Sequence, residues 1–216
     1  MRYFLPCLYY LLTIPYSLIC YTNPMQQDIE RILIDRHTIA NRVREIAEQI
    51  TADFQEEGTP GLPEITIVPI LTGSFMFVAD LVRDLPLRMQ IRLITVSSYP
   101  GTSTESKPAK IGSDLDDLPA SLAGSHVLLV DDILDSGQTL RLVSELLSAK
   151  NPASLKSCVL LRKKRPAAMQ QPVDYVAFDI PDEFVVGYGL DYDDYYRNLP
   201  DIVVLKPDVV SQQQEG

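Results

Sequence analysis

The sequence predicts an α/β fold in which the strands of a central parallel sheet alternate with helices. Short runs rich in Val, Ile and Leu have the composition of strands that are buried on both faces. Two of these runs lead through a short polar turn into apolar residues at helical spacing. At 216 residues, of which 46% are hydrophobic, the chain is long enough to bury the core of a single domain.

The sequence divides into an apolar N-terminal extension at residues 1–24, one domain at 25–206 and a polar tail at 207–216. We expect Met25 to be the physiological start, or residues 1–24 to be a disordered extension; a targeting segment is the alternative. A helix that spans a bilayer needs about 20 apolar residues. Because prolines interrupt the extension, it is marginal as such a helix, and we expect a cytoplasmic protein without stable membrane association.

The domain is expected to begin with an amphipathic helix from Asp35 to Phe54. Its apolar residues recur at positions i, i+4, i+7, i+8 and i+11, and charged residues fill its other face. Gly and Pro then predict a loop at residues 58–63. A buried strand at Ile65–Leu71 and a helix at Phe75–Leu85 follow, with a short polar turn between them.

The stretch from Val127 to Leu140, VLLVDDILDSGQTL, is the most informative part of the chain. Val127–Val130 predicts a buried strand, and Asp131 and Asp132 follow it directly. This places both carboxylates at the carboxyl edge of the sheet, where open α/β folds bind ligands. A polar turn follows at the same edge of the sheet. It leads into a predicted helix with apolar residues from Leu140 to Leu147. That turn consists of Asp135, Ser136, Gly137, Gln138 and Thr139.

The two halves of this stretch suit one kind of ligand. A helix N-terminus and the N–H groups of a turn bind a phosphate, whereas paired carboxylates suit sugar hydroxyls or a metal ion. A ribose 5-phosphate would satisfy both halves. The alternative, in which Asp131 and Asp132 merely end a strand, is disfavoured because acids, Gly and Thr all fall where a phosphate needs them.

This stretch resembles the signature of the type I phosphoribosyltransferases, which bind 5-phosphoribosyl 1-pyrophosphate. The resemblance implies that Asp131 and Asp132 hold the ribose hydroxyls and that residues 135–139 hold the 5-phosphate. It also implies the fold of that family, a central parallel sheet flanked by helices with a small hood subdomain. The hood is expected to contain the N-terminal segment and residues 173–206.

A second anion-binding turn is expected at Leu71-Thr72-Gly73-Ser74, directly after the first buried strand. A plain turn is the default interpretation of these residues alone. The resemblance implies that Leu71, Thr72 and Gly73 bind pyrophosphate, often through a non-proline cis peptide. A lysine is common in the purine-salvage members where Thr72 stands, so this chain is expected to rely more on backbone groups.

A further strand is expected at Arg88–Val96, followed by the polar segment Ser97–Ile111. This segment is rich in Ser, Thr, Gly and Pro, which is typical of a functional or a disordered loop. The family carries a flexible lid here, so the resemblance implies that Ser98 and Tyr99 belong to a lid that excludes water from the reaction. A disordered surface loop is the alternative.

The run Leu155–Leu161 predicts another strand, and four cations follow it at residues 162–165. A nucleic-acid patch and a solvated turn are the two interpretations of these cations alone. The stretch FVVGYGLDYDDYYRNLP, which begins at Phe184, is similar to the purine-site signature of the hypoxanthine-guanine phosphoribosyltransferases. In that register Lys163 contacts the purine 6-oxo group, although Lys164 fits almost as well.

The same resemblance assigns roles near the C-terminus, where Val173–Phe178 and Ile202–Leu205 predict strands. It implies that Phe184 stacks on the purine and that the backbone of Val185 reads its edge. Asp191 is expected to lie at the purine and to assist Mg²⁺ together with Asp131 and Asp132, and Arg197 to contact pyrophosphate. Composition alone would suggest a ligand pocket or a packed hood about equally.

The implied activity is transfer of a phosphoribosyl group to nitrogen-9 of hypoxanthine or guanine, with release of pyrophosphate. Asp135 is the expected general base for the purine proton. It is also the best discriminator, because the adenine transferases carry a small residue there and the pyrimidine-operon regulators carry a Tyr. The alternatives are a xanthine- or guanine-preferring transferase and a regulator that kept the fold and lost catalysis.

Charge and cysteine content set limits on partners. The chain has 19 basic and 29 acidic residues, which gives a formal net charge of −10 and argues against general nucleic-acid binding. Three scattered cysteines are too few for a disulfide framework. The resemblance implies Mg²⁺ as the cofactor, a 6-oxopurine and 5-phosphoribosyl 1-pyrophosphate as small-molecule substrates, and a homodimer or homotetramer.

Overall fold

The computed structural model describes residues 24–56, 64–97, 110–111 and 118–212. The strands are β1 (Ile29–Ile34), β2 (Glu64–Leu71), β3 (Arg88–Ile91), β4 (Ile94–Ser97), β5 (Lys110–Ile111), β6 (His126–Leu134), β7 (Ser154–Lys163), β8 (Tyr175–Ile180) and β9 (Ile202–Leu205). The helices are α1 (Arg36–Glu56), α2 (Phe75–Asp84), α3 (Gln138–Ser148), α4 (Pro166–Gln170) and α5 (Pro207–Gln212), and a short 3-10 helix spans Pro24–Asp28. Most of these elements lie where the sequence predicts them.

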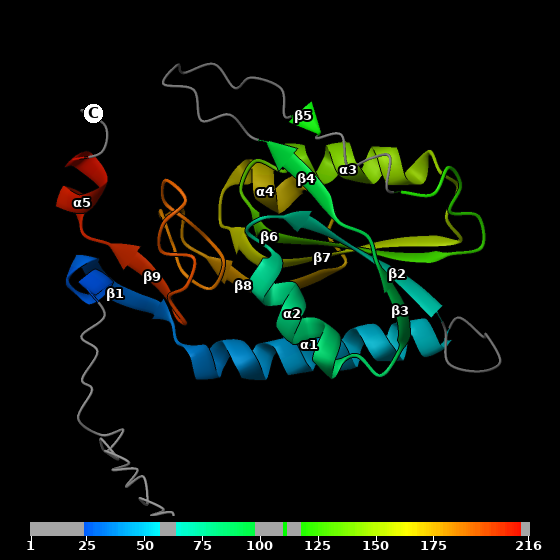
Figure 1. The fold of residues 1–216 in the computed structure, drawn as a ribbon, viewed down its shortest axis with the longest axis horizontal. Coiled ribbons are helices and arrows are strands. Elements are labelled where there is room, and N and C mark those ends of the chain that lie inside the picture. Colours follow the sequence, from blue (N-terminus) through cyan, green and yellow to red (C-terminus); the bar gives the residue numbers. More distant parts are fainter. Residues whose placement is uncertain (1–23, 57–63, 98–109, 112–117, 213–216) are drawn as a thin grey trace, which may run out of the picture.

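The main sheet has seven strands in the order β5-β4-β2-β6-β7-β8, and β3 also pairs with β2. The pairs between β2, β3, β4, β6, β7 and β8 are parallel, and only β5 runs antiparallel to its neighbour β4. Figure 1 shows α1 and α2 on one face of this sheet and α3 and α4 on the other. The predicted parallel α/β architecture is therefore confirmed.

Strand β6 lies in the middle of the sheet and contributes to a core on each face. Leu128 and Val130 pack in the cluster that includes α1 and α2, whereas Val127 and Leu129 pack in the cluster that includes α3. These four side chains are fully buried. Because neighbouring residues of a strand point to opposite faces, an unbroken apolar run is required where both faces are covered.

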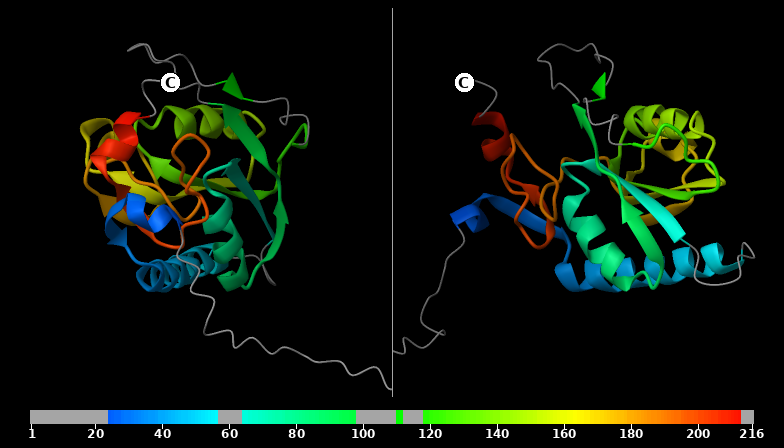
Figure 2. Two further views of the ribbon diagram at one scale, coloured as in Figure 1. Left: turned by 60° about the vertical axis from the view of Figure 1, so that its left-hand side comes forward. Right: turned by 45° about the vertical axis from the view of Figure 1, so that its right-hand side comes forward.

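A smaller subdomain, which we call the hood, lies beyond the carboxyl ends of the parallel strands (Figure 2). It consists of β1 and β9, which pair antiparallel, the irregular segment 181–201 and α5. Asp201 ties the hood to α1 through two hydrogen bonds from the Arg36 guanidinium, at 3.1 and 2.9 Å. The hood is therefore anchored at the point where the chain passes from β1 into the main domain.

Three features of the fold differ from the sequence-based predictions. Strand β1 was not predicted, and the expected polar tail contains the short helix α5. Residues 173–206 do not belong wholly to the hood, because β8 pairs with β7 in the main sheet. Charged residues inside β1 explain the first difference, since Glu30 and Arg31 lie exposed on a strand that only its distant partner β9 stabilises.

The single strand expected at Arg88–Val96 is two strands, β3 and β4, and proline explains the interruption. Both strands keep the same register with β2, but the positions opposite Val68 and Pro69 are unpaired. The Arg92 N–H bonds to the Ile67 carbonyl at 2.9 Å, so the polar groups of Ile67 face this side of β2. Alternation along the strand turns Pro69 to the same side, where it has no N–H to donate.

Some sequence-based expectations lie outside the described residues. These are the nature of the extension at residues 1–23, the loop at 58–63, the lid residues Ser98 and Tyr99, and the end of the tail at 213–216. Within the ranges that the structure covers, every helix is too short or too polar to cross a membrane.

The central position of β6 leads to a stability prediction. Leu128→Ala should lower the free energy of unfolding by about 2–5 kcal/mol, because it opens a cavity in a closely packed core. Ile32→Ala in β1 is the control; its side chain is 51% exposed, and its replacement should cost less than about 1 kcal/mol. Urea unfolding followed by circular dichroism measures both, and equal losses would contradict the assignment of β6 to the core.

Candidate functional site

Four segments that carry predicted site residues meet at the carboxyl edge of the sheet. They are the turn after β2, the end of β6 with the turn into α3, the end of β7, and the hood segment 184–197. In parallel α/β sheets this edge is the usual place for a ligand. The structure thus brings together residues that lie more than 100 positions apart in the chain.

Asp131 and Asp132 lie on β6 itself, which corrects the expectation that the strand ends at Val130. Pairing with β2 does stop at Val130, opposite Pro69, but pairing with β7 continues as far as Leu134. The apolar run ends before the strand does, because one neighbour of the strand continues. The two carboxylates therefore stand on a rigid element, at the point where the β2 chain turns away.

Both carboxylates are held close to the backbone. An Asp131 oxygen accepts the Asp132 N–H at 3.0 Å, and an Asp132 oxygen accepts the Ile133 N–H at 2.9 Å. Asp131 is only 5% exposed; burial raises its pKa well above the ordinary value, and the neighbouring Asp132 charge raises it further. Burial also raises the pKa of Asp132. The pair therefore favours a ligand that offsets two crowded negative charges, such as hydroxyl donors or a cation.

The turn after β2 lies directly against this pair. The Leu71–Thr72 peptide bond is cis, as the resemblance implied. A Cβ built on Gly73 would lie 1.6 Å from an Asp132 carboxylate oxygen, and one built on Gly189 would lie 2.2 Å from the Gly73 carbonyl oxygen. Asp132, Gly73 and Gly189 therefore form one stack, which joins β6, the turn and the hood without room for a side chain at either glycine.

The turn from Asp135 to Thr139 leads directly into α3. The helix begins at Gln138, and its first backbone hydrogen bond runs from the Arg141 N–H to the Gly137 carbonyl at 3.0 Å. The N–H groups of a first helical turn have no partner inside the helix and carry the positive end of the helix dipole. Ser136 and Gln138 are exposed, and the Gln138 N–H donates to the Ser136 hydroxyl oxygen at 3.4 Å, so the start of α3 is open to solvent and suited to an anion.

Asp135 is bound by two cations, one at the end of β7 and one directly before α4. Lys163 donates to one carboxylate oxygen at 3.1 Å, and Arg165 donates to the other. Partial burial alone would raise the pKa of Asp135, but the bonds from Arg165 and Lys163 outweigh it and lower the pKa below the ordinary value. Asp135 is therefore an ionised acceptor at neutral pH. Lys163 thus contacts Asp135, whereas Lys164 is exposed.

The hood contributes an exposed aromatic ring and a guanidinium. Phe184 is 46% exposed and touches the ring of Tyr192 edge to face, with centroids 5.3 Å apart, while Val185 is buried. Arg197 pairs with Asp191 at 2.9 Å and donates to the Gly189 carbonyl at the same distance. An exposed Phe face beside a buried neighbour is suited to stacking on a flat ligand.

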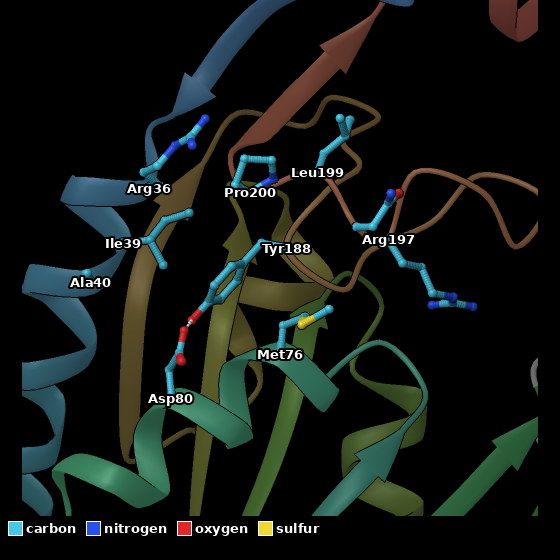
Figure 3. A pocket seen from close by; sticks show the side chains of 10 residues that line it. Arg36, Ile39, Ala40, Met76, Asp80, Tyr188, Arg197, Leu199 and Pro200 are labelled. Atoms are coloured by element: carbon cyan, nitrogen blue, oxygen red, sulfur yellow. Dashed lines mark hydrogen bonds between the residues drawn. The ribbon is translucent and has the colours of Figure 1, made fainter. Parts of the chain in front are cut away.

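A cavity of about 350 Å³ lies behind this edge, between α1, α2 and the hood (Figure 3). Tyr188 stands in it, and its hydroxyl donates to Asp80 of α2 at 2.7 Å. Because α2 begins directly after the turn that contains Gly73, this bond is a second link between the hood and that turn. Arg197 and Pro200 complete the wall on the hood side.

Sequence reasoning missed several residues that the structure brings to the site. Arg165 contacts the predicted residue Asp135, and Asp182 contacts the predicted residue Lys163. Gly189 lets the hood pack against the Gly73 carbonyl. The run of cations at 162–165 was the available indication for Arg165. Nothing in the sequence pairs it with an aspartate 30 positions earlier.

The carboxylates fit a magnesium ion that shares its coordination with a substrate. Among the described residues no three His, Cys, Asp or Glu side chains cluster as a complete metal site. Mg²⁺ typically keeps several waters and binds one or two carboxylates together with substrate phosphates. Asp131 and Asp132, as oxygen donors crowded together at the edge, suit that mode, whereas Asp191 is paired with Arg197.

Comparisons with known proteins agree with this geometry. The family model for the phosphoribosyl transferase domain matches residues 32–193. The chain is 42% identical over 168 residues to a hypoxanthine phosphoribosyltransferase from Haemophilus influenzae, which covers 78% of this chain and 90% of the relative. It is 40% identical to a hypoxanthine-guanine phosphoribosyltransferase from Mycobacterium bovis, over 84% of this chain and 89% of the relative.

A solved structure is similar over the same region. It is a hypoxanthine phosphoribosyltransferase from Trypanosoma cruzi in complex with the product IMP, with a TM-score of 0.74 and 41% sequence identity. The similarity covers 85% of this chain and 97% of that one. At this level of identity the likeness extends to the sequence as well as to the fold.

The stack of Gly73 and Gly189 generates a prediction. Gly189→Ala should destabilise the protein by about 2–5 kcal/mol, because the new methyl group meets the Gly73 carbonyl and the backbone is left-handed, with φ of +103°. Gly124→Ala is a matched control; Gly124 is also left-handed, at φ of +78°, but faces open space, so only strain of about 1–2 kcal/mol is expected. Thermal unfolding compares them, and a smaller loss at Gly189 would refute the close contact.

Proposed function

Because the chain belongs to the phosphoribosyl transferase family, we propose that it transfers a phosphoribosyl group from 5-phosphoribosyl 1-pyrophosphate to nitrogen-9 of hypoxanthine or guanine. The products would be inosine or guanosine monophosphate and pyrophosphate. The activities printed for the relatives support this proposal, as does the solved relative with IMP bound. The protein would then act in purine salvage.

The observation that carries the proposal is the position of Asp135. It lies at the start of the turn into α3, three residues after the carboxylate pair, and contacts Lys163 from the neighbouring strand. A site for a sugar phosphate and a site for a 6-oxopurine would therefore share this residue. Lys163 is a donor for the 6-oxo group, Asp135 an acceptor for N7–H, and Phe184 a face for the purine ring.

In the proposed reaction a bond forms between N9 and the anomeric carbon as the bond from that carbon to pyrophosphate breaks. The proton on N7 passes to the Asp135 carboxylate, whose lowered pKa keeps it ionised beforehand. Asp131 and Asp132 orient the ribose hydroxyls, and the N–H groups of residues 136–139 bind the 5-phosphate. Arg197 and the backbone of Leu71, Thr72 and Gly73 bind the departing pyrophosphate.

Magnesium would neutralise part of the charge on the leaving pyrophosphate. We assign Asp131 and Asp132 as the carboxylates nearest to it and Asp191 as a further candidate, because these oxygens lie at the same edge of the sheet. Thr72 stands where the resemblance leads one to expect a lysine, so the pyrophosphate turn supplies backbone groups. The proposal also includes a cytoplasmic homodimer or homotetramer and a lid that contains Ser98 and Tyr99.

A substrate panel tests the proposed function. The purified protein, 5-phosphoribosyl 1-pyrophosphate and Mg²⁺ are combined with hypoxanthine, guanine, xanthine or adenine, and nucleotide formation is followed. We expect turnover with hypoxanthine or guanine, and its loss when EDTA removes the metal. Preference for xanthine would favour the xanthine-type alternative, and no nucleotide with any purine would favour a regulator that lost catalysis.

The role of Asp135 has its own test. Asp135→Asn should lower kcat about 100-fold or more, because the amide cannot accept the N7 proton. The KM for 5-phosphoribosyl 1-pyrophosphate should change little, since the N–H groups that bind the phosphate remain. Asp179→Asn is a control, because Asp179 lies at the end of β8 and pairs only with Arg162 among the contacts that the structure shows for it. Unchanged turnover in Asp135→Asn would refute the assigned base.

A further inference from the structure

Four charged side chains, one of which is the proposed base Asp135, form a ring. Lys163 lies 3.1 Å from one oxygen of Asp135 and 3.5 Å from an oxygen of Asp182. Arg165 contacts the other oxygen of Asp135, and its Nε lies 3.6 Å from the second oxygen of Asp182. Each cation therefore touches both carboxylates, and each carboxylate touches both cations.

A purine that reacts here meets this ring first. Lys163 and Arg165 each hold one oxygen of Asp135, so a purine N7–H competes with one of these cations for the oxygen that it approaches. Lys163 is also the donor expected at the purine 6-oxo group. The simplest opening is thus at the bond between Lys163 and Asp135, because it frees one acceptor and one donor for the same ligand.

We propose that Arg165 and Asp182 are positioning residues for the proposed reaction. Arg165 stays on one oxygen of Asp135 and fixes the carboxylate, while Asp182 keeps hold of Lys163 when the purine displaces it from the other oxygen. This inference rests on the proposed function, and it adds two residues to which the sequence analysis assigned no role.

The chemistry of the two side chains suits these tasks. A guanidinium does not lose its charge and has several donors in a rigid plane, so Arg165 holds one oxygen without competing for the N7 proton. Lys163 is a compact ammonium with three donors. Its side chain is only 12% exposed, so leaving the ammonium without a partner would be costly. The Asp182 carboxylate, at 3.5 Å, is a second acceptor that keeps it paired.

A neighbouring pair of the same residue types offers a matched control. Arg162 and Asp179 also join β7 to β8, with hydrogen bonds of 2.6 and 3.1 Å between them. They are the same two residue types as Arg165 and Asp182, but they are paired with each other and not with Asp135. Substitutions in the two pairs therefore distinguish an effect on Asp135 from a general effect on the packing of β7 against β8.

Steady-state kinetics with hypoxanthine and 5-phosphoribosyl 1-pyrophosphate test the proposal. Arg165→Gln should lower kcat about tenfold with little change in either KM, because the base is no longer fixed. Asp182→Asn should raise the KM for hypoxanthine about tenfold and change kcat less, because Lys163 then leaves Asp135 less readily. The double variant should lose less than the product of the two factors, because the residues belong to one ring.

Arg162→Gln and Asp179→Asn are the controls and should stay within about twofold of the wild type. Circular dichroism checks that each variant folds. A ¹³C NMR titration of the Asp135 carboxyl group without substrate provides a second readout. The charged groups that face it are Lys163 at the end of β7 and Arg165 directly before α4, with Asp182 after β8 behind them. Loss of the Arg165 cation should raise the pKa of Asp135.

The outcomes separate this inference from the proposed function. A wild-type protein that makes no nucleotide from any purine would overturn the proposed function, and this inference with it. An active wild type whose Arg165→Gln and Asp182→Asn variants match the two controls would overturn this inference alone. The same holds if the Asp135 titration is unchanged in Arg165→Gln.

Discussion

The crowding of Asp131 and Asp132 on β6 is the constraint around which the carboxyl edge is arranged. Two adjacent carboxylates, one of them 5% exposed, are costly to bury, and their raised pKa values express that cost. They remain in place because β6 stays paired with β7 beyond the point where β2 departs. Strand β6 therefore supplies core residues and also holds Asp131 and Asp132. The stability of this strand offsets the repulsion between the two carboxylates.

The stack from Asp132 through Gly73 to Gly189 transmits this arrangement to the hood. A Cβ on Gly73 would meet the Asp132 carboxylate, and one on Gly189 would meet the Gly73 carbonyl, so the turn after β2 packs closely against both β6 and the hood segment. Tyr188 reinforces it through Asp80, and Arg197 reinforces it through the Gly189 carbonyl. These contacts hold the hood against the turn, although its segment 181–201 has little regular structure of its own.

The sequence predicted what depends on local pattern and missed what depends on distant partners. The apolar repeat located α1 closely, and the run at Ile202–Leu205 matches β9 at both ends. β1 was missed because its stability comes from β9, about 170 positions away, and not from its own charged sequence. The end of β6 was placed too early for a related reason, since hydrophobicity stops at Val130 while pairing with β7 continues to Leu134. The ring around Asp135 needs β7 beside β6, which no local pattern reveals.

The electrostatics of the edge explain how a chain with a net charge of −10 is suited to an anionic ligand. Lys163, Arg165 and Arg197 each pair with aspartates that the site itself supplies. Under the proposed function, a phosphate or a polar purine edge would exchange one partner for another and would not meet bare cations. Such an exchange costs less than desolvating a free charge, and it keeps the cations oriented beforehand. The acidic balance of the chain is then compatible with the site, because Asp135, Asp182 and Asp191 each hold a cation at this edge.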